Sequence, residues 1–169
     1  MASPATDLKL VARYAHTELV IEAQMPQMTD LMESVRAWRL DVTPQETMWV
    51  IALDSLAQVR TIVQIAKGGY HEVDIPLAAL LSVPLLASSD RMVIMHNHPA
   101  GDTTPTKADL DMTRRIMLAG NTCGIYLEDS VIIGPGGGFF SLVENGYMKE
   151  PKELNKAYRQ RVTVKGQDR

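Results

Sequence analysis

Apolar residues in the N-terminal part of this chain recur with a helical period. Residues 7–24 and 29–40 have the spacing of amphipathic helices, and Pro26 breaks the pattern between them. We therefore treat residues 1–43 as a helical segment that precedes a region with a different period.

The middle of the chain alternates short apolar runs, typical of strands, with two helical patterns. Strands are predicted at residues 47–54, 58–65, 91–96, 124–127, 130–134 and 139–143. Helices are predicted at residues 75–87, where Pro84 interrupts the pattern, and at residues 108–120. The fourth and fifth strands are expected to pair, and the Gly-rich segment 134–138 to form a hairpin turn. This order predicts an α/β (α+β) fold with helices on both sides of a mixed sheet.

Composition limits the class of protein without selecting one. A chain of 169 residues with 46% hydrophobic content is long enough for one core, so a single domain is expected. No apolar run approaches a membrane span, and the N-terminus lacks the form of a signal peptide. These features predict a cytoplasmic protein that does not enter a membrane. The single Cys123 excludes an internal disulfide, and its apolar surroundings predict a buried thiol.

Charge is distributed unevenly. Residues 149–169 hold seven Lys or Arg and three acids, a surplus of four that leaves −7 on residues 1–148 within the total of −3. Acids are interspersed and Tyr158 is the only aromatic residue there, so a solvated, flexible tail is expected. An acidic domain does not favour tight nucleic-acid binding, although the basic tail leaves such contact open. The oligomeric state is not indicated.

The segment from His96 to Asp109 carries the strongest chemical signal. His96 and His98 follow a predicted strand at alternate positions, so both imidazoles should project to one face. Asp109 lies in the first turn of the next predicted helix and can point back toward the end of the strand. Two imidazoles and one carboxylate, with a fourth position left for water, are the ligand set of a catalytic zinc site.

The same residues also admit a purely structural interpretation. Thr106 and Asp109 have the spacing of a capping box, in which the hydroxyl accepts the third helical N–H and the acid reaches back. Anionic side chains are in any case favoured at helix N-termini. What favours a metal site is that the His pair, the following Pro99 and this Thr-x-x-Asp all fall in one segment.

This pattern resembles the JAMM (MPN+) metalloprotease motif, His-x-His-Pro followed by Pro-[Ser/Thr]-x-x-Asp. The surrounding sequence, from His96-Asn97-His98-Pro99 to Phe140-Ser141-Leu142-Val143-Glu144-Asn145-Gly146, is similar to the RadC branch of that superfamily. The resemblance covers about residues 44–148, which are expected to form a JAMM/MPN-like domain. RadC proteins commonly carry a helix-hairpin-helix region in front of it. Residues 1–43 lack the Gly-containing hairpins of such a region, so this chain resembles a short form.

The resemblance also implies residues that act on the reaction. A JAMM site needs an upstream Glu as general base, and Glu46, at the entrance to the strand 47–54, occupies that place. Glu46 could instead belong to a helix cap beginning at Thr43, and Glu72 is the reserve candidate for the base. Thr106 stands where the family usually has Ser, whose hydroxyl would donate to the oxyanion. Asn97 should face away from the metal and stabilise the sheet.

A zinc-dependent peptidase or isopeptidase, acting on an amide in a protein or peptide of unknown identity, is the function that the resemblance implies. Two other classes remain open. One is an accessory protein associated with DNA repair, which the history of RadC-like proteins implies but no residue supports directly. The other is a JAMM-fold binding module without catalytic activity.

Overall fold

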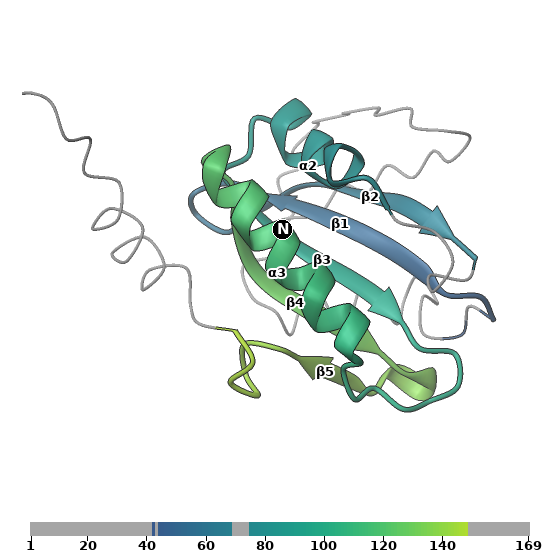
Figure 1. The fold of residues 1–169 in the computed structure, drawn as a ribbon. Coiled ribbons are helices and arrows are strands. Elements are labelled where there is room, and N and C mark those ends of the chain that lie inside the picture. The colour runs from purple at the N-terminus through teal and green to yellow at the C-terminus, as the bar shows by residue number, and fades with distance from the viewer. Residues whose placement is uncertain (1–41, 43, 69–74, 149–169) are drawn as a thin grey trace, which may run out of the picture.

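A five-stranded mixed sheet forms the centre of the domain, with the strands in the order β2-β1-β3-β4-β5 (Figure 1). The computed structural model describes residues 42, 44–68 and 75–148. Its elements are β1 (Thr47–Leu53), β2 (Val59–Lys67), α2 (Leu77–Leu86), β3 (Arg91–Asn97), α3 (Lys107–Thr122), β4 (Tyr126–Ile133), the 3₁₀ turn η2 (Pro135–Gly137) and β5 (Phe139–Ser141).

The two most buried strands, β1 and β3, lie next to each other in the sheet. β1 pairs antiparallel with both β2 and β3, whereas β3 pairs parallel with β4. All seven residues of β1 are buried, as its nearly continuous apolar run predicts. β5 pairs antiparallel with β4 at the edge and is short.

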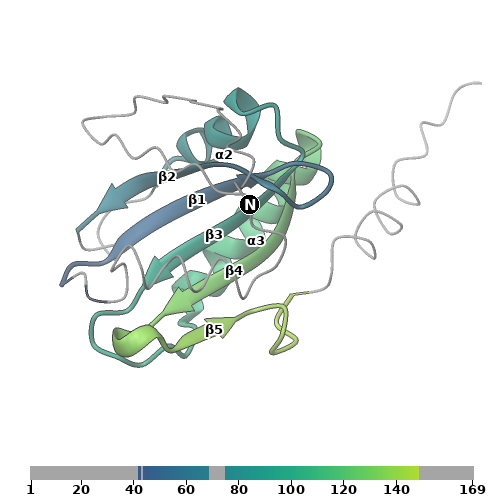
Figure 2. The ribbon, with the colours of Figure 1, turned by 180° about the vertical axis from the view of Figure 1, so that it is seen from behind.

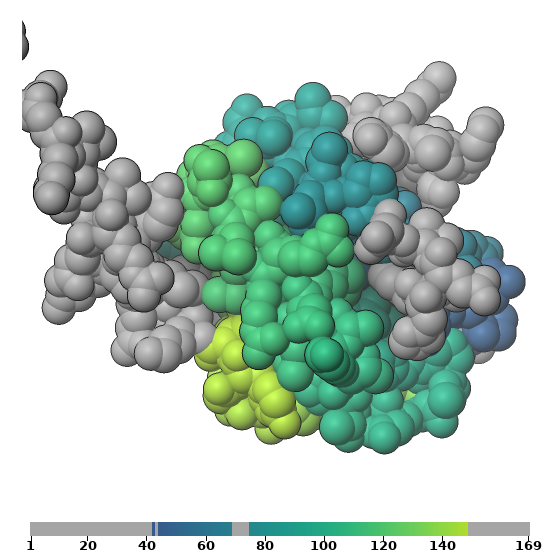
Figure 3. All heavy atoms as spheres, viewed as in Figure 1, coloured from purple at the N-terminus to yellow at the C-terminus, as the bar shows by residue number. Residues whose placement is uncertain are grey.

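Both described helices pack against the same face of the sheet, as the two opposite views show (Figures 1 and 2). In the space-filling view, α2 and α3 lie side by side over that face (Figure 3). The core between them and the sheet contains Met48, Val50, Leu80, Leu81, Met92, Ile94, Ile116 and Ile132, among others. The predicted mixed sheet flanked by helices is confirmed. The expected helices on both sides are not: among the described residues only this face carries helices, and the predicted N-terminal helices lie outside them.

The segment predicted as two paired strands, residues 124–127 and 130–134, forms the single strand β4 instead. Glu128 and Asp129 suggested a turn, but the register of β4 against β3 skips Glu128, which places the irregularity within the strand. The polar pair is accommodated because Glu128 forms an ion pair with Arg91, at 2.6 Å, and Asp129 has hydrogen-bond donors of its own.

Two further sequence predictions need correction. Pro84 does not interrupt α2: it lies inside the helix, which continues to Leu86 although Pro84 has no N–H to donate. Cys123 is exposed, since it follows the end of α3 and precedes the strand that the apolar pattern belongs to. The Gly-rich segment 134–138 does form a turn between β4 and β5, as predicted. No helix in the described part of the chain is long and apolar enough to cross a bilayer.

A buried carboxyl group in β4 joins β5 and the segment after it to the sheet. Asp129 is 4% exposed and accepts hydrogen bonds from the backbone N–H groups of Ser130 and Val143 and from the Ser141 hydroxyl. Burial raises the pKa of Asp129, although the hydrogen bond from Ser141 and those from the backbone oppose this. The carboxyl group therefore holds the chain after β5 against β4.

We predict that Asp129→Ala lowers the free energy of unfolding by about 3 kcal/mol, because buried donors lose their acceptor. Urea unfolding measures the change. Asp54→Ala is the matched control, since Asp54 also accepts two backbone N–H groups, from Leu56 and Gln58, but in an exposed turn. Its expected loss is about 1 kcal/mol. Equal losses in the two variants would contradict the assigned role of Asp129.

Candidate metal centre

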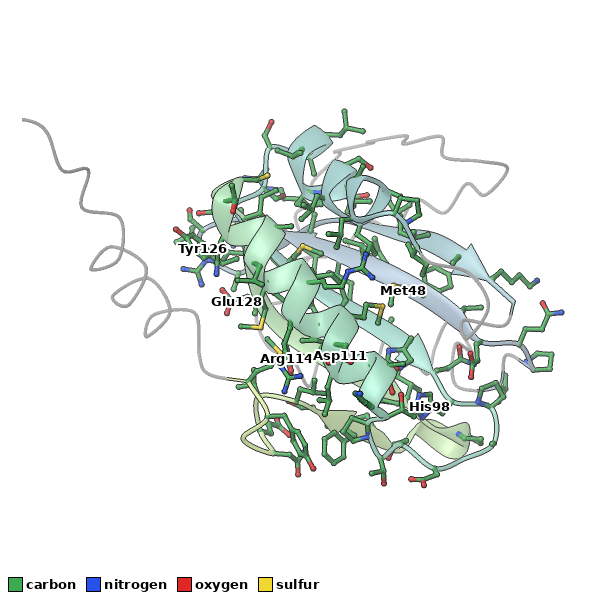
Figure 4. The ribbon with its side chains drawn as sticks, viewed as in Figure 1. Met48, His98, Asp111, Arg114, Tyr126 and Glu128 are labelled. Carbon is green, nitrogen blue, oxygen red and sulfur yellow. The ribbon has the colours of Figure 1, made fainter. Side chains whose placement is uncertain are left out.

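His96 lies near the C-terminal end of β3, on the sheet face that α3 covers. Its strand partners are Met48 in β1 and Ile132 in β4, whose side chains belong to the apolar core. His96 is only 2% exposed, so its imidazole is a polar group at the margin of that core. Figure 4 shows Met48 on the neighbouring strand, with His98 beyond the end of β3 near the first turn of α3.

His98 continues the strand alternation one residue beyond β3. Its backbone N–H donates to the Ile133 carbonyl, at 2.8 Å, which prolongs the ladder between β3 and β4. Residues two apart in an extended strand project to the same face. The Nε2 atoms of His96 and His98 are accordingly 3.1 Å apart, which confirms the predicted projection of both imidazoles to one side.

The tautomer of His98 follows from the hydrogen bond of Nδ1, the ring nitrogen that faces away from His96. Nδ1 lies 2.7 Å from the Asp102 carbonyl oxygen, which can only accept a hydrogen bond. Nδ1 therefore carries the proton, and in the neutral ring Nε2 presents a lone pair toward His96 and Asp109. Fixing the tautomer through the second ring nitrogen is the usual way in which proteins orient a metal-binding histidine.

Asp109 enters the centre from the first turn of α3. One carboxylate oxygen, Oδ2, accepts hydrogen bonds from the Thr106 backbone N–H, at 2.7 Å, and from the Thr106 hydroxyl, at 2.6 Å. The other, Oδ1, lies 3.1 Å from His96 Nε2. The predicted capping box is therefore present, and it does not compete with a role as ligand, because each role uses a different oxygen.

The electrostatic environment keeps Asp109 ionised. Burial of the carboxyl raises its pKa, but the hydrogen bonds from His96 and Thr106 outweigh burial and hold the pKa of Asp109 well below its usual range. The N-terminus of α3 adds its positive dipole end to the same effect. A carboxylate anion therefore faces the two imidazoles at neutral pH.

The donor atoms of the three side chains fit a small cation. One ligand atom from each of His96, His98 and Asp109 lies within 4.8 Å of the others. Ligands about 2.0–2.2 Å from a tetrahedral zinc are separated by about 3.4 Å. His96 Nε2 lies 3.1 Å from His98 Nε2 and 3.1 Å from Asp109 Oδ1, which is close to that value, whereas the oxygen 3.6 Å from His98 Nε2 is the capping oxygen Oδ2. Two imidazole nitrogens and one carboxylate oxygen form a donor set that suits zinc and other divalent metals.

Glu46 immediately precedes β1 at the same end of the sheet. Met48 pairs with His96, and the Glu46 carbonyl accepts a hydrogen bond from Gly68, at 2.8 Å, which continues the β1–β2 ladder. Because strand side chains alternate, a residue two positions before Met48 projects to the face that carries His96. Glu46 is half-buried. Its helix-cap interpretation is not supported, since β1 follows it directly; the reserve candidate Glu72 lies outside the described residues.

Thr106 is the N-cap of α3, and its hydroxyl is engaged there. It donates to Asp109 Oδ2 and accepts from the Asp109 backbone N–H, at 3.2 Å. To donate to an oxyanion, the hydroxyl would have to leave its bond with the carboxylate. The oxyanion role therefore stays a prediction, whereas the capping role is observed.

Two supports of the centre were not predicted from the sequence. The Asp102 carbonyl, which orients His98, is a backbone group, and no side-chain pattern signals it. Gly134 lies against the loop that joins the ligands: a Cβ added there would stand 2.8 Å from the Thr103 methyl carbon and 3.3 Å from the Gly101 carbonyl oxygen. Gly134 thus lets the turn after β4 approach this loop closely.

Comparison with known proteins agrees with this architecture. The family model described as "RadC-like JAB domain" matches residues 20–147. The UPF0758 protein of Porphyromonas gingivalis is 30% identical over 86% of this chain and 66% of its own length. UPF0758 proteins of Geotalea uraniireducens and of a Clostridium botulinum strain are 34% and 35% identical, over 62% and 64% of this chain and 45% and 47% of their own lengths.

The chain thus spans about half to two thirds of the length of these curated relatives. The matched region contains β1 to β5 and all three residues of the candidate centre. By this match over most of its length, the chain belongs to the RadC-like JAB domain family.

Proposed function

We propose that this protein is a zinc-dependent peptidase or isopeptidase that hydrolyses an amide bond in a protein or peptide. The observation that carries the proposal is the convergence of His96, His98 and Asp109, with the His98 lone pair directed at the other two side chains. Membership of a JAB family supports the same reaction class. Glu46 lies two residues before Met48, the strand partner of His96, and is the candidate general base.

The chemistry follows from the parts. Zinc held by two imidazoles and one carboxylate would polarise the scissile carbonyl and lower the pKa of bound water to about 7. Glu46 would take a proton from the attacking water and pass it to the leaving nitrogen. The water oxygen bonds to the carbonyl carbon while the C–N bond breaks, which leaves a carboxylate and an amine. Asp109, already ionised, needs no proton loss to bind the cation.

The first prediction concerns metal content. The protein purified with zinc should hold about one zinc per chain, and His96→Ala, His98→Ala and Asp109→Ala should each lose most of it, because two remaining ligands hold the ion poorly. Elemental analysis measures zinc and iron together, since two imidazoles and a carboxylate also suit Fe²⁺.

Asp111→Ala provides the matched control for Asp109→Ala. Asp111 lies in the same helix but is exposed and pairs with Arg114 on the outer surface, so its loss should leave the zinc content unchanged. Full zinc content in a variant without both His96 and His98 would refute the proposed centre.

The second prediction concerns the base. Glu46→Gln should keep zinc and the fold but abolish cleavage, because the amide cannot accept the proton of the attacking water. The probe is a library of peptides from a digested proteome, incubated with the zinc-loaded protein in ¹⁸O-labelled water. Mass spectrometry then identifies new C-termini that carry the label.

Glu128→Gln is the matched control, because Glu128, in β4, is also half-buried but forms an ion pair with Arg91 in β3. It should cleave like the wild type. Wild-type cleavage by Glu46→Gln would remove Glu46 from the mechanism and leave Glu72 as the next residue to test. Full zinc content without any cleavage of peptides or of isopeptide-linked conjugates would favour a binding module.

The third prediction separates the two roles of the Thr106 hydroxyl. Thr106→Ala should cost about 1 kcal/mol of stability through the lost cap and, if the oxyanion contact forms, about 10²-fold or more in turnover. Thr106→Ser should preserve both. Thr106→Asn also caps a helix but places its donor differently, so it should melt near the wild type and cleave poorly. Near-normal turnover by Thr106→Ala below its melting temperature would limit Thr106 to starting α3.

A further inference from the structure

Asn97 stands between the two histidines but faces the other side of the sheet. It is 4% exposed and pairs with Ile133 in β4, on the face opposite to His96. Its side chain therefore cannot reach a substrate bound beside the histidines. Any influence on the reaction has to pass through the residues that the side chain contacts.

Those contacts lie on the segment that carries Glu46. Asn97 Oδ1 accepts hydrogen bonds from the Thr47 backbone N–H, at 2.7 Å, and from the Thr47 hydroxyl, at 2.8 Å. Asn97 Nδ2 donates to the Gln45 carbonyl, at 3.1 Å. One amide group thus binds the residue before Glu46 and the residue after it. The indole Nε1 of Trp49 donates to the Thr47 hydroxyl, at 3.0 Å, and completes the chain of hydrogen bonds.

The donors and acceptors in this network require an amide at position 97. The Gln45 carbonyl needs a donor, whereas the Thr47 N–H needs an acceptor, and the Asn97 amide presents both on separate atoms of one planar group. Aspartate would place an oxygen against the Gln45 carbonyl. Alanine would leave the buried Thr47 N–H without this acceptor, at a cost that hydrogen bonding elsewhere in β1 does not repay.

We propose that Asn97 is a positioning residue for the general base: it fixes the backbone on both sides of Glu46 and so holds the Glu46 carboxylate beside the metal centre. This inference rests on the proposed function. It adds that the His-Asn-His segment presents metal ligands on one face of the sheet and controls the base from the other. Consecutive residues of a strand face opposite sides of the sheet, so one three-residue segment can carry out both tasks.

The test uses the full chain loaded with Co²⁺, whose visible absorption reports the surroundings of the metal without any substrate. We compare the wild type, Glu46→Gln, Asn97→Asp, Asn97→Ala and the double variant Glu46→Gln/Asn97→Asp. The matched control is Asp129→Asn, since Asp129 is equally buried and lies on the same face of the sheet, away from Glu46. Urea unfolding checks that each variant is folded. If Asn97→Ala does not fold, Asn97→Asp alone tests the role of Asn97.

We expect Co²⁺ affinity to stay at the wild-type value in every variant, because the ligands are unchanged. The spectrum of Asn97→Asp should shift in the same direction as that of Glu46→Gln, and the double variant should match Glu46→Gln alone, since both changes remove one interaction. On the peptide probe, kcat should fall about 10- to 100-fold in Asn97→Asp with KM unchanged. Asp129→Asn should retain the wild-type spectrum and kcat.

Each of the other outcomes contradicts either the role of Asn97 or the role of Glu46. A wild-type spectrum in Asn97→Asp alongside a shifted spectrum in Glu46→Gln overturns the role of Asn97 and leaves the proposed function intact. A wild-type spectrum in Glu46→Gln removes Glu46 from the centre, and the inference with it. Equal shifts in Asp129→Asn and Asn97→Asp would show that any buried change on this face disturbs the metal, which also overturns the inference.

Discussion

The hydrogen bonds of the Asp109 carboxylate are the interaction on which the centre depends. One oxygen closes the capping box of α3, and the other faces His96 at the end of β3. The same group therefore fixes where the helix begins and how the helix meets the sheet. A carboxylate held by a helix cap has little rotational freedom left to lose, so the fold itself organises the three side chains that could bind a cation.

β3 contributes to this organisation through the simplest property of a strand, the alternation of its side chains. His96 and His98 project toward α3, while Asn97 projects to the opposite face and binds the start of β1. A shift of register by one residue would exchange the two sets. The apolar pairs of β1 with β3, from Trp49 opposite Met95 to Ala52 opposite Met92, make such a shift costly. The packing of the core thus fixes which side chains of β3 face α3.

The parts of the structure that the sequence predicted well are those governed by local spacing. The strand of His96, the turn after it and the cap at Thr106 lie within one short segment. Their roles can be inferred from residue type and spacing alone. The predicted break at Glu128 and Asp129 was wrong because the compensation comes from distant residues, Arg91 and Ser141. The same holds for the contact of Gly134 with Thr103, which depends on how two loops meet.

Chain connectivity divides the candidate site residues into a local group and a distant one. His96 and Asp109 are only 13 positions apart, whereas Glu46 precedes His96 by 50. Loop-closure entropy grows with the logarithm of loop length, so adding Glu46 costs about 1 kcal/mol more than joining the ligands. His96, His98 and Asp109 can come together through the short segment between β3 and α3, whereas the segment of Glu46 reaches them only through the pairing of β1 with β3. The three side chains that could bind a cation are thus independent, in loop-closure entropy, of the segment that carries Glu46.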